Sequence, residues 1–470
     1  MRVLKCLFTS RLFALAVLLF SGCATIKDAG EFRRNHIEEY QEELKSRNER
    51  IQGTLTLEQC IALAMEFNYD ARQADVKREL AKLDRNTSFS SFLPTLTGTA
   101  SITNWEFAPS MSGMQTSDAT IRSASLKLTV PLLVPVAYFM FQNSKQGLAI
   151  ADLAAHYTRQ SVILQTSAAY YQVLITQKQI RTLETQTEAA KKLLDRLSGL
   201  AENGLATNWQ KGEANYLYTA RLASLQNARR KLVADKGALL KLMGMNPLAT
   251  IKLADISEPV QLPKESMDEM LYTAIQAHPS LAIADQQSVI AENNVRKAIA
   301  DFFPIIGVIG NSDWTSNSFA DHAQQLYISL AGSMDLFKGF TKFFAYKSAK
   351  FKQESARLDR EATMLSVMLQ VVKSVNTLYE AQSMLGVVQA EHDYYQGKYK
   401  DYEAKFKEGL LPIHEVLDAQ SNLFQAEGRL ADAQYATYLA KAHLDMALGT
   451  LAIPDEEENP AIVKPEPLKN

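Results

Sequence analysis

The chain of 470 residues carries a formal net charge of −2, and 47% of its residues are hydrophobic. That length accommodates several ordinary domains, and that composition is typical of neither a disordered chain nor a polybasic one. We expect no nucleic acid partner, because 50 basic side chains balanced by 52 acidic ones leave no excess of positive charge for a phosphate backbone.

The N-terminal segment has the layout of an export signal. Basic residues come first, an apolar stretch follows at residues 12–20, and two small residues then lead to Cys23. This resembles the signal of a bacterial lipoprotein, so we expect residues 1–22 to be removed and Cys23 to be acylated. An ordinary secretory signal with a chance cysteine is the alternative. The apolar stretch is too short to remain as a membrane-spanning helix. By resemblance to such lipoproteins, Ala24 after the cysteine favours sorting to the outer membrane.

The second half of the chain repeats the spacing of the first half, which predicts an internal duplication. Aromatic, proline and glycine positions coincide at offsets of 210 and 205 residues: Phe92 with Phe302, Pro94 with Pro304, Gly204 with Gly409, and Gly244 with Gly449. The predicted organisation is a signal peptide at 1–22, an anchor and equatorial segment at 23–55, a first repeat at 56–244, an equatorial linker at 245–265, a second repeat at 266–450 and a disordered tail at 451–470.

Each repeat has the same order of predicted elements: a helix that a proline ends, two strands of period 2, a long helix and a return helix. The ranges in the two repeats are 56–91 and 266–302 for the first helix, 97–107 with 121–130 and 305–315 with 325–334 for the strands, and 136–198 and 340–408 for the long helix. Each long helix would measure about 100 Å at 1.5 Å per residue. The first and return helices together have about that length, so they could lie end to end beside it.

The four predicted strands are long enough to cross a bilayer when tilted, since a membrane strand needs about 9–11 residues. Four strands cannot close a barrel, and a sheet with open edges is not tolerated in lipid. Several subunits would therefore share one barrel. Two subunits would supply about eight strands and three about twelve, and the larger barrel leaves room for a passage.

Several motifs resemble those of the TolC-like outer-membrane efflux family over essentially the whole mature length. They are Phe-Leu-Pro at 92–94, Phe-Phe-Pro at 302–304, Met-Asp-Leu-Phe-Lys-Gly at 334–339 and Glu-Gly-Leu-Leu-Pro-Ile-His-Glu-Val-Leu-Asp-Ala-Gln at 408–420. The resemblance implies an α+β membrane protein that forms a homotrimer. Four strands per chain would make a twelve-strand β-barrel in the outer membrane, continued by a long α-helical barrel in the periplasm.

The same resemblance implies that a periplasmic adaptor and an inner-membrane transporter are partners, together with outer-membrane lipid. We therefore predict a channel subunit of a tripartite efflux or type I secretion system, which conducts substrates passively to the exterior. The alternative is a lipid-anchored periplasmic structural coiled coil, because the leucine and alanine spacing of the return helices also fits a coiled-coil seam.

The turns between long and return helices would form the periplasmic tip. Glu415 and Asp418 lie on one helix face. By resemblance, they match the family's acidic entrance ring, which would favour cations. The alternative is an ordinary solvated helix face. Phe406 and Leu411 replace a tyrosine and an arginine that can lock this tip, so we predict a gate closed by apolar packing with Trp209. The turn residues expected to contact the adaptor are Gly204, Leu205, Gly409 and Leu410.

The sequence lacks the patterns of an enzyme. His414-Glu415 has no second histidine at metal-binding spacing, and the nucleophile-elbow, P-loop and dinucleotide glycine patterns are missing from the sequence. We therefore expect no catalytic residues, no metal and no cofactor.

Overall fold

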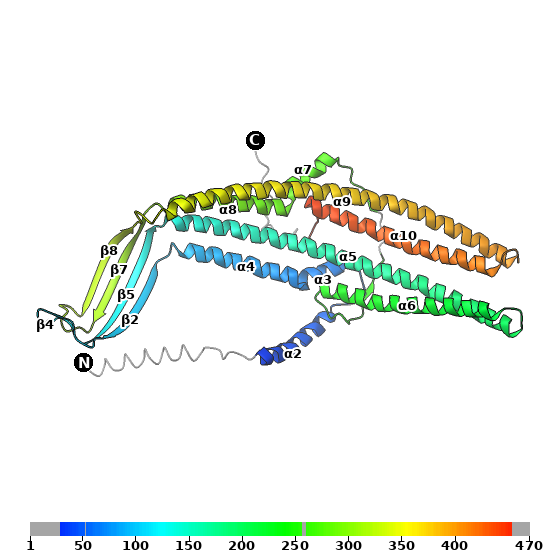
Figure 1. Ribbon diagram of the computed structural model, residues 1–470, viewed down its shortest axis with the longest axis horizontal. Coiled ribbons are helices and arrows are strands. Elements are labelled where there is room, and N and C mark those ends of the chain that lie inside the picture. The colour runs from blue at the N-terminus through cyan, green and yellow to red at the C-terminus, as the bar shows by residue number, and fades with distance from the viewer. Residues whose placement is uncertain (1–28, 52, 256–259, 454–470) are drawn as a thin grey trace.

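The computed structural model describes residues 29–51, 53–255 and 260–453. The described chain is elongated, with a small sheet at one end and long helices that run from it to a tip at the other end (Figure 1). Cys23 and the predicted signal lie outside the described residues, as do most of the predicted tail and residues 256–259 of the predicted linker.

The described part of the first half contains a charged helix, two shorter helices, five strands and a long helical hairpin. In order, its elements are α2 (Ala29–Asn48), β1 (Thr54–Leu55), α3 (Leu57–Phe67), α4 (Tyr69–Ser90), β2 (Thr95–Asn104), β3 (Ser110–Met111), β4 (Met114–Gln115), β5 (Thr120–Leu133), α5 (Pro135–Glu202) and α6 (Asn208–Leu242). The small β3–β4 hairpin lies between the first two predicted strands, in a segment for which no strand was predicted. Its turn places Ser112 and Gly113 at positive φ.

The second half follows nearly the same order. Its elements are β6 (Lys252–Leu253), α7 (Met267–Ala277), α8 (Pro279–Ala300), β7 (Ile305–Thr315), β8 (Gln324–Ser333), α9 (Thr341–Lys407) and α10 (Ile413–Leu448). The long helices α5 and α9 have 68 and 67 residues, so both predicted long helices are confirmed. The prediction of one continuous first helix in each repeat is wrong, since α3 and α4 are separated at Asn68 and α7 and α8 at His278.

The main sheet is antiparallel, with the strand order β2-β5-β7-β8. Residues on one face form apolar rows across the strands, such as Leu96, Leu128, Gly310 and Ile328. The opposite face carries polar rows, such as Thr99, Ser125, Asp313 and Gln325. Strands β2 and β8 each pair on one side only within the described chain. The sheet is therefore two-faced and has two open edges.

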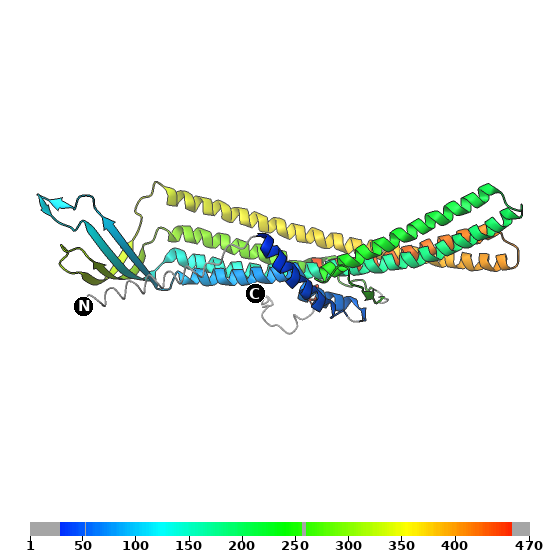
Figure 2. The same cartoon turned by 90° about the horizontal axis from the view of Figure 1, so that it is seen from below.

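The shorter helices pack along the length of the two long helices (Figures 1 and 2). Helix α5 packs on α4 and α8 near the sheet, and on α6 and α10 toward the tip. Helix α9 likewise packs on α8 near the sheet and on α10 toward the tip. The predicted arrangement of two shorter helices beside one long helix is therefore confirmed in both halves. Within the part of the chain that is described, no helix combines the length and the apolar character needed to span a membrane.

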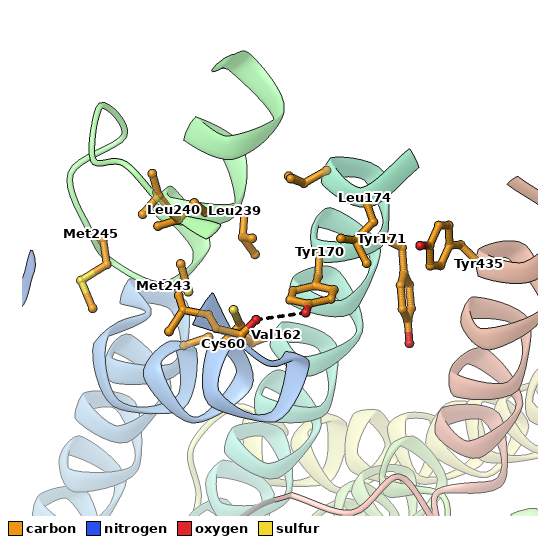
Figure 3. Packing of buried hydrophobic residues seen from close by; sticks show 14 of the residues in the cluster. Cys60, Val162, Tyr170, Tyr171, Leu174, Leu239, Leu240, Met243, Met245 and Tyr435 are labelled. Atoms are coloured by element: carbon orange, nitrogen blue, oxygen red, sulfur yellow. Dashed lines mark hydrogen bonds between the residues drawn. The ribbon is translucent and has the colours of Figure 1, made fainter. Parts of the chain in front are cut away.

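The largest hydrophobic cluster lies at the waist, where α3, α5, α6 and α10 meet (Figure 3). Its fully buried members include Cys60, Tyr170, Leu239, Met243 and Tyr435. Each large apolar side chain buried here contributes roughly 1.5–3 kcal/mol to stability. Beside this cluster, β1 pairs in parallel with β6, so the segment that follows α2 and the linker between the halves are joined at the same place.

Candidate functional site

Two similar turns form the tip that lies farthest from the sheet (Figure 1). Gly204 follows α5 at φ +71° and Gly409 follows α9 at φ +75°. The next amide donates to a carbonyl five residues earlier in each turn, at 2.8 Å from Leu205 and 2.9 Å from Leu410. This is the Schellman end of a helix, in which glycine adopts the left-handed conformation at little cost. The sequence repeat at these glycines therefore corresponds to a repeated backbone turn.

The leucines after these glycines project from the tip. Leu205 keeps 76% of its surface exposed and Leu410 keeps 70%. Exposed leucines at equivalent positions of two neighbouring turns give the tip two apolar projections. The prediction that these turns contact a partner protein stays a prediction, and their exposure in the single chain is what such a contact requires.

The predicted acidic pair lies near the start of α10. Glu415 is half-buried in its first turn, and Asp418 is exposed three residues later. Within the described residues, neither carboxylate has a hydrogen-bond or salt-bridge partner, so both charges remain uncompensated by side chains. A helix N-terminus favours negative charge in its first turn, which stabilises the Glu415 carboxylate, while Asp418 is exposed to solvent.

The three residues predicted to close the tip are not buried together in the single chain. Phe406 and Leu411 are half-buried at the α9–α10 turn. Trp209 lies in the first turn of α6 and keeps 67% of its surface exposed. Mutual packing of these side chains therefore stays a prediction, one that would have to be met between chains or in another state of the tip.

A polar network at the waist was not predicted from the sequence. The Tyr170 hydroxyl lies 2.6 Å from the carbonyl oxygen of Ala254 and 3.1 Å from that of Leu55. The Tyr435 hydroxyl donates to Asp255 Oδ1 at 2.7 Å, and Lys178 lies 3.4 Å from Asp255 Oδ2. Burial raises the pKa of both tyrosines, which keeps their hydroxyls protonated as donors. The network therefore ties the linker to α5 and α10.

A buried arginine, Arg47, contributes to the attachment of helix α2 to the waist. Arg47 is 3% exposed, and its guanidinium donates to the Gly244 carbonyl at 2.8 Å and to the Tyr69 hydroxyl at 3.3 Å. It also lies 5.0 Å from the centroid of the Phe67 ring. Arg47 stands among many other charged residues, so the local sequence carries no signal that this one is buried.

The breaks in the short helices form two comparable junctions at the waist. In the first, Asn68 Oδ1 accepts from the amides of Asp70 at 2.8 Å and Ala71 at 3.2 Å, and Asn68 Nδ2 donates to the Leu242 carbonyl at 2.8 Å. These bonds both cap α4 and connect it to the end of α6.

In the second junction, His278 takes the place of the asparagine. Its Nδ1 accepts from the Ser280 amide at 3.2 Å, and its Nε2 has no partner within the described residues. His278 is 2% exposed, and burial lowers the pKa of its imidazole. The following Pro279 also disfavours helical backbone at His278, so a sequence signal for this break was present.

Comparisons with known proteins point in one direction. A family model described as "Outer membrane efflux protein" matches residues 60–245 and 270–450. The outer membrane protein TolC of Escherichia coli K12 is 24% identical over 400 residues, covering 82% of this chain and 80% of that protein. The probable outer membrane lipoprotein SilC of Salmonella typhimurium is 22% identical over 404 residues, covering 83% and 84%. The solved Campylobacter jejuni CmeC outer membrane channel superposes with a TM-score of 0.74 at 17% identity, covering 85% of this chain and 87% of that one.

Proposed function

Because the chain belongs to the outer membrane efflux protein family, we propose that it is one subunit of a homotrimeric channel that conducts substrates passively across the outer membrane. The channel receives its substrates from a periplasmic adaptor and an inner-membrane transporter, and it releases them outside the cell. The observation that carries this proposal is a two-faced, four-stranded sheet with open edges at the end of two helices of 68 and 67 residues.

The faces of the sheet suit a shared barrel. Leu96 and Ile328 on the apolar face are 70% and 78% exposed in the single chain, and lipid would cover such a row. The opposite face, with Thr99, Ser125 and Asp313, suits a water-filled lumen. Open edges are not tolerated in lipid, and pairing β8 of one chain with β2 of the next removes both. Three chains then supply about twelve strands.

The long helices suit a periplasmic tunnel. At about 1.5 Å per residue, α5 and α9 each extend about 100 Å beyond the sheet. The tip would then lie deep in the periplasm, where exposed Leu205 and Leu410 are available to an adaptor. Acylation of Cys23 would add a lipid anchor, which the lipoprotein description of the SilC relative supports.

The tip would also be the entrance of the channel. Three copies of Glu415 and Asp418 around one axis would form a ring of carboxylates, which attracts cations and raises the barrier to anions. Phe406, Leu411 and Trp209 would close the resting channel by packing between neighbouring hairpins, since the polar lock residues of many family members are replaced here.

Reconstitution in planar bilayers tests the function and the entrance together. The wild-type chain should insert and conduct, with a preference for cations over anions. Glu415→Gln combined with Asp418→Asn should reduce this preference several-fold, because it removes the uncompensated charges at the entrance. The control is Glu354→Gln combined with Glu361→Gln, which removes the same charge from the exposed surface of α9 near the sheet.

The channel and its acidic entrance can each be contradicted separately. If the wild-type chain gives no conductance and the Cys23→Ala variant is soluble without detergent, the structural coiled-coil alternative is supported. An unchanged ion preference in the Glu415→Gln, Asp418→Asn variant would remove the acidic pair from the entrance while leaving the channel itself in place.

A further inference from the structure

A groove of about 410 Å³ lies between α4 and α5, close to the ends of these helices that adjoin the sheet. It is lined by Arg85, Asn86, Phe89, Phe141, Lys145 and Leu148. Arg85 and Phe89 belong to the last two turns of α4, and Phe141 lies about 9 Å along α5 from its start at Pro135. The groove therefore combines basic and aromatic side chains within a few turns of the sheet.

Three phenylalanine rings form an aromatic cluster at the groove. The ring centroid of Phe141 lies 5.6 Å from that of Phe89 and 6.1 Å from that of Phe92. The Lys145 ammonium lies over the Phe141 ring, 4.7 Å from its centroid. Side chains on a helix lean toward its N-terminus, which for α5 is the end next to the sheet. Lys145 therefore directs its charge back toward the sheet.

The cations at this groove lack acidic partners, unlike the cations farther along the same α4–α5 seam. There, Arg78 pairs with Asp152 at 2.9 Å and Arg159 pairs with Asp75 at 2.6 Å.

Within the described residues, by contrast, the Arg85 guanidinium donates hydrogen bonds only to the amide oxygen of Asn86, at 3.0 Å from Nη2 and 3.3 Å from Nε. Lys145 has no carboxylate partner there. Two uncompensated positive charges therefore face one groove at the end of the seam that adjoins the sheet.

The position of the groove fits the inner surface of the membrane, an argument that rests on the proposed function. If the sheet crosses the outer membrane, α4 and α5 meet it at the periplasmic interface. The headgroup layer beneath the hydrocarbon core is about 5–8 Å thick. Arg85 lies about 8 Å from the end of α4. The Lys145 ammonium lies over Phe141, about 9 Å from the start of α5. The groove therefore lies at the inner edge of the headgroup layer, where long basic side chains can meet a lipid phosphate.

We propose that this groove binds an anionic phospholipid of the inner leaflet, with its phosphate between Arg85 and Lys145 and its glycerol and upper acyl chain against Phe89 and Phe141. The unpaired cations supply charge complementarity, and the aromatic cluster supplies an apolar surface beside it. A lipid held there connects the first helices of the chain to the membrane where the sheet begins.

The test measures binding of phosphatidylglycerol to the full-length detergent-solubilised protein by native mass spectrometry, with phosphatidylcholine as the zwitterionic comparison. Near an anionic surface, each lysine or arginine changes affinity about fivefold. Arg85→Gln combined with Lys145→Gln should therefore weaken phosphatidylglycerol binding about thirtyfold and leave phosphatidylcholine unchanged. Asn86→Asp adds a carboxylate to the groove without removing its packing, and it should also weaken phosphatidylglycerol binding.

The matched control is Lys347→Gln. Lys347 lies near the start of α9, at a similar depth, with its ammonium 5.3 Å from the Phe343 ring centroid, but it does not line this groove. Its substitution should leave lipid binding unchanged. The proposal is overturned if the control loses as much binding as the double variant. It is also overturned if either the Arg85→Gln, Lys145→Gln double variant or Asn86→Asp binds like the wild type. Full displacement of the lipid by inorganic phosphate would overturn it as well. A conducting wild-type channel without phosphatidylglycerol binding overturns this inference alone.

Discussion

The two waist junctions use the same backbone arrangement with different side chains. In each junction, a kink residue caps the start of the short helix nearer the sheet, and a glycine with positive φ lies at the end of the return helix beside it. The pairs are Asn68 with Gly244 and His278 with Gly449. Asn68 satisfies its oxygen and its amide group, whereas His278 leaves one ring nitrogen without a partner in the described chain. The steric requirement is the same in the two halves, while the polar chemistry at the kink differs between them.

Substituting the two waist glycines should have the largest effect. A Cβ at Gly244 would lie 2.4 Å from the Phe67 carbonyl oxygen, and one at Gly449 would lie 2.7 Å from that of Ala277. Backbone overlap of this kind cannot be relieved by a side-chain rotation, and the positive φ adds strain. We expect Gly244→Ala and Gly449→Ala each to cost about 2–5 kcal/mol, with a lower midpoint of thermal unfolding followed by circular dichroism.

The tip glycines provide the control for this experiment. Gly204 and Gly409 also have positive φ, but a Cβ at either would meet no atom within 4 Å. Gly204→Ala and Gly409→Ala should therefore cost only the backbone strain, about 1–2 kcal/mol. Equal losses of stability at the waist and at the tip would show that the close approach of Gly244 and Gly449 to the backbone at the kinks contributes nothing.

A second, intermediate effect should separate the two roles of Asn68. Asn68→Ala removes the cap of α4 and the bond to the Leu242 carbonyl, so it should cost about 1–3 kcal/mol. Asn68→Ser keeps a capping oxygen but not the bond to α6, and it should recover part of the loss. Thermal unfolding of both variants measures the division. Identical midpoints for alanine and serine would mean that capping is irrelevant at this kink.

The smallest effect should appear in the pH dependence of stability. Burial lowers the pKa of His278 in the folded chain. The neutral imidazole therefore contributes fully to folding stability when the pH is above the ordinary histidine pKa of about 6.5, and this contribution is lost as the pH falls below that value. His278→Asn, which copies the residue of the first junction, should therefore reduce the drop in unfolding midpoint between pH 7.5 and 5.

The exposed His36 on α2 supplies the control for the pH experiment, because it lies outside the waist. His36→Asn should retain the acid sensitivity of the wild-type chain. His443, whose pKa burial also lowers, should leave some acid sensitivity in the His278→Asn variant. A His278→Asn chain with an unchanged acid response would show that the second junction tolerates the proton.

Much of the architecture was predictable, because its signals are local. Period-2 segments predicted strands that fall within a few residues of β2, β5, β7 and β8, and uninterrupted helical runs predicted α5 and α9. The break at Asn68 was not predicted, since an asparagine inside a helical pattern leaves the helix only when its side chain finds partners elsewhere. Those partners include Leu242, which lies 174 residues away.

The candidate site was predictable only in part. Spacing placed Glu415 and Asp418 on one face of α10, and the glycine repeat located both tip turns. Packing of Trp209 could not be derived in this way, because contacts between hairpins or chains depend on assembly rather than on local spacing. The roles of Arg47 and Asp255 were missed for the same reason, since each residue pairs with groups far away in the sequence.

The sequence by itself determined the family, the order of the long helices and the four main strands, the length of the two long helices and the glycine turns, because periodicity and backbone freedom are properties of neighbouring residues. Only the tertiary structure decided which charges are compensated. Arg78 and Arg159 find carboxylates across the α4–α5 seam, whereas Arg85 and Lys145 do not. Ion pairing depends on distances between separate helices, and the register that sets those distances arises only when the helices pack.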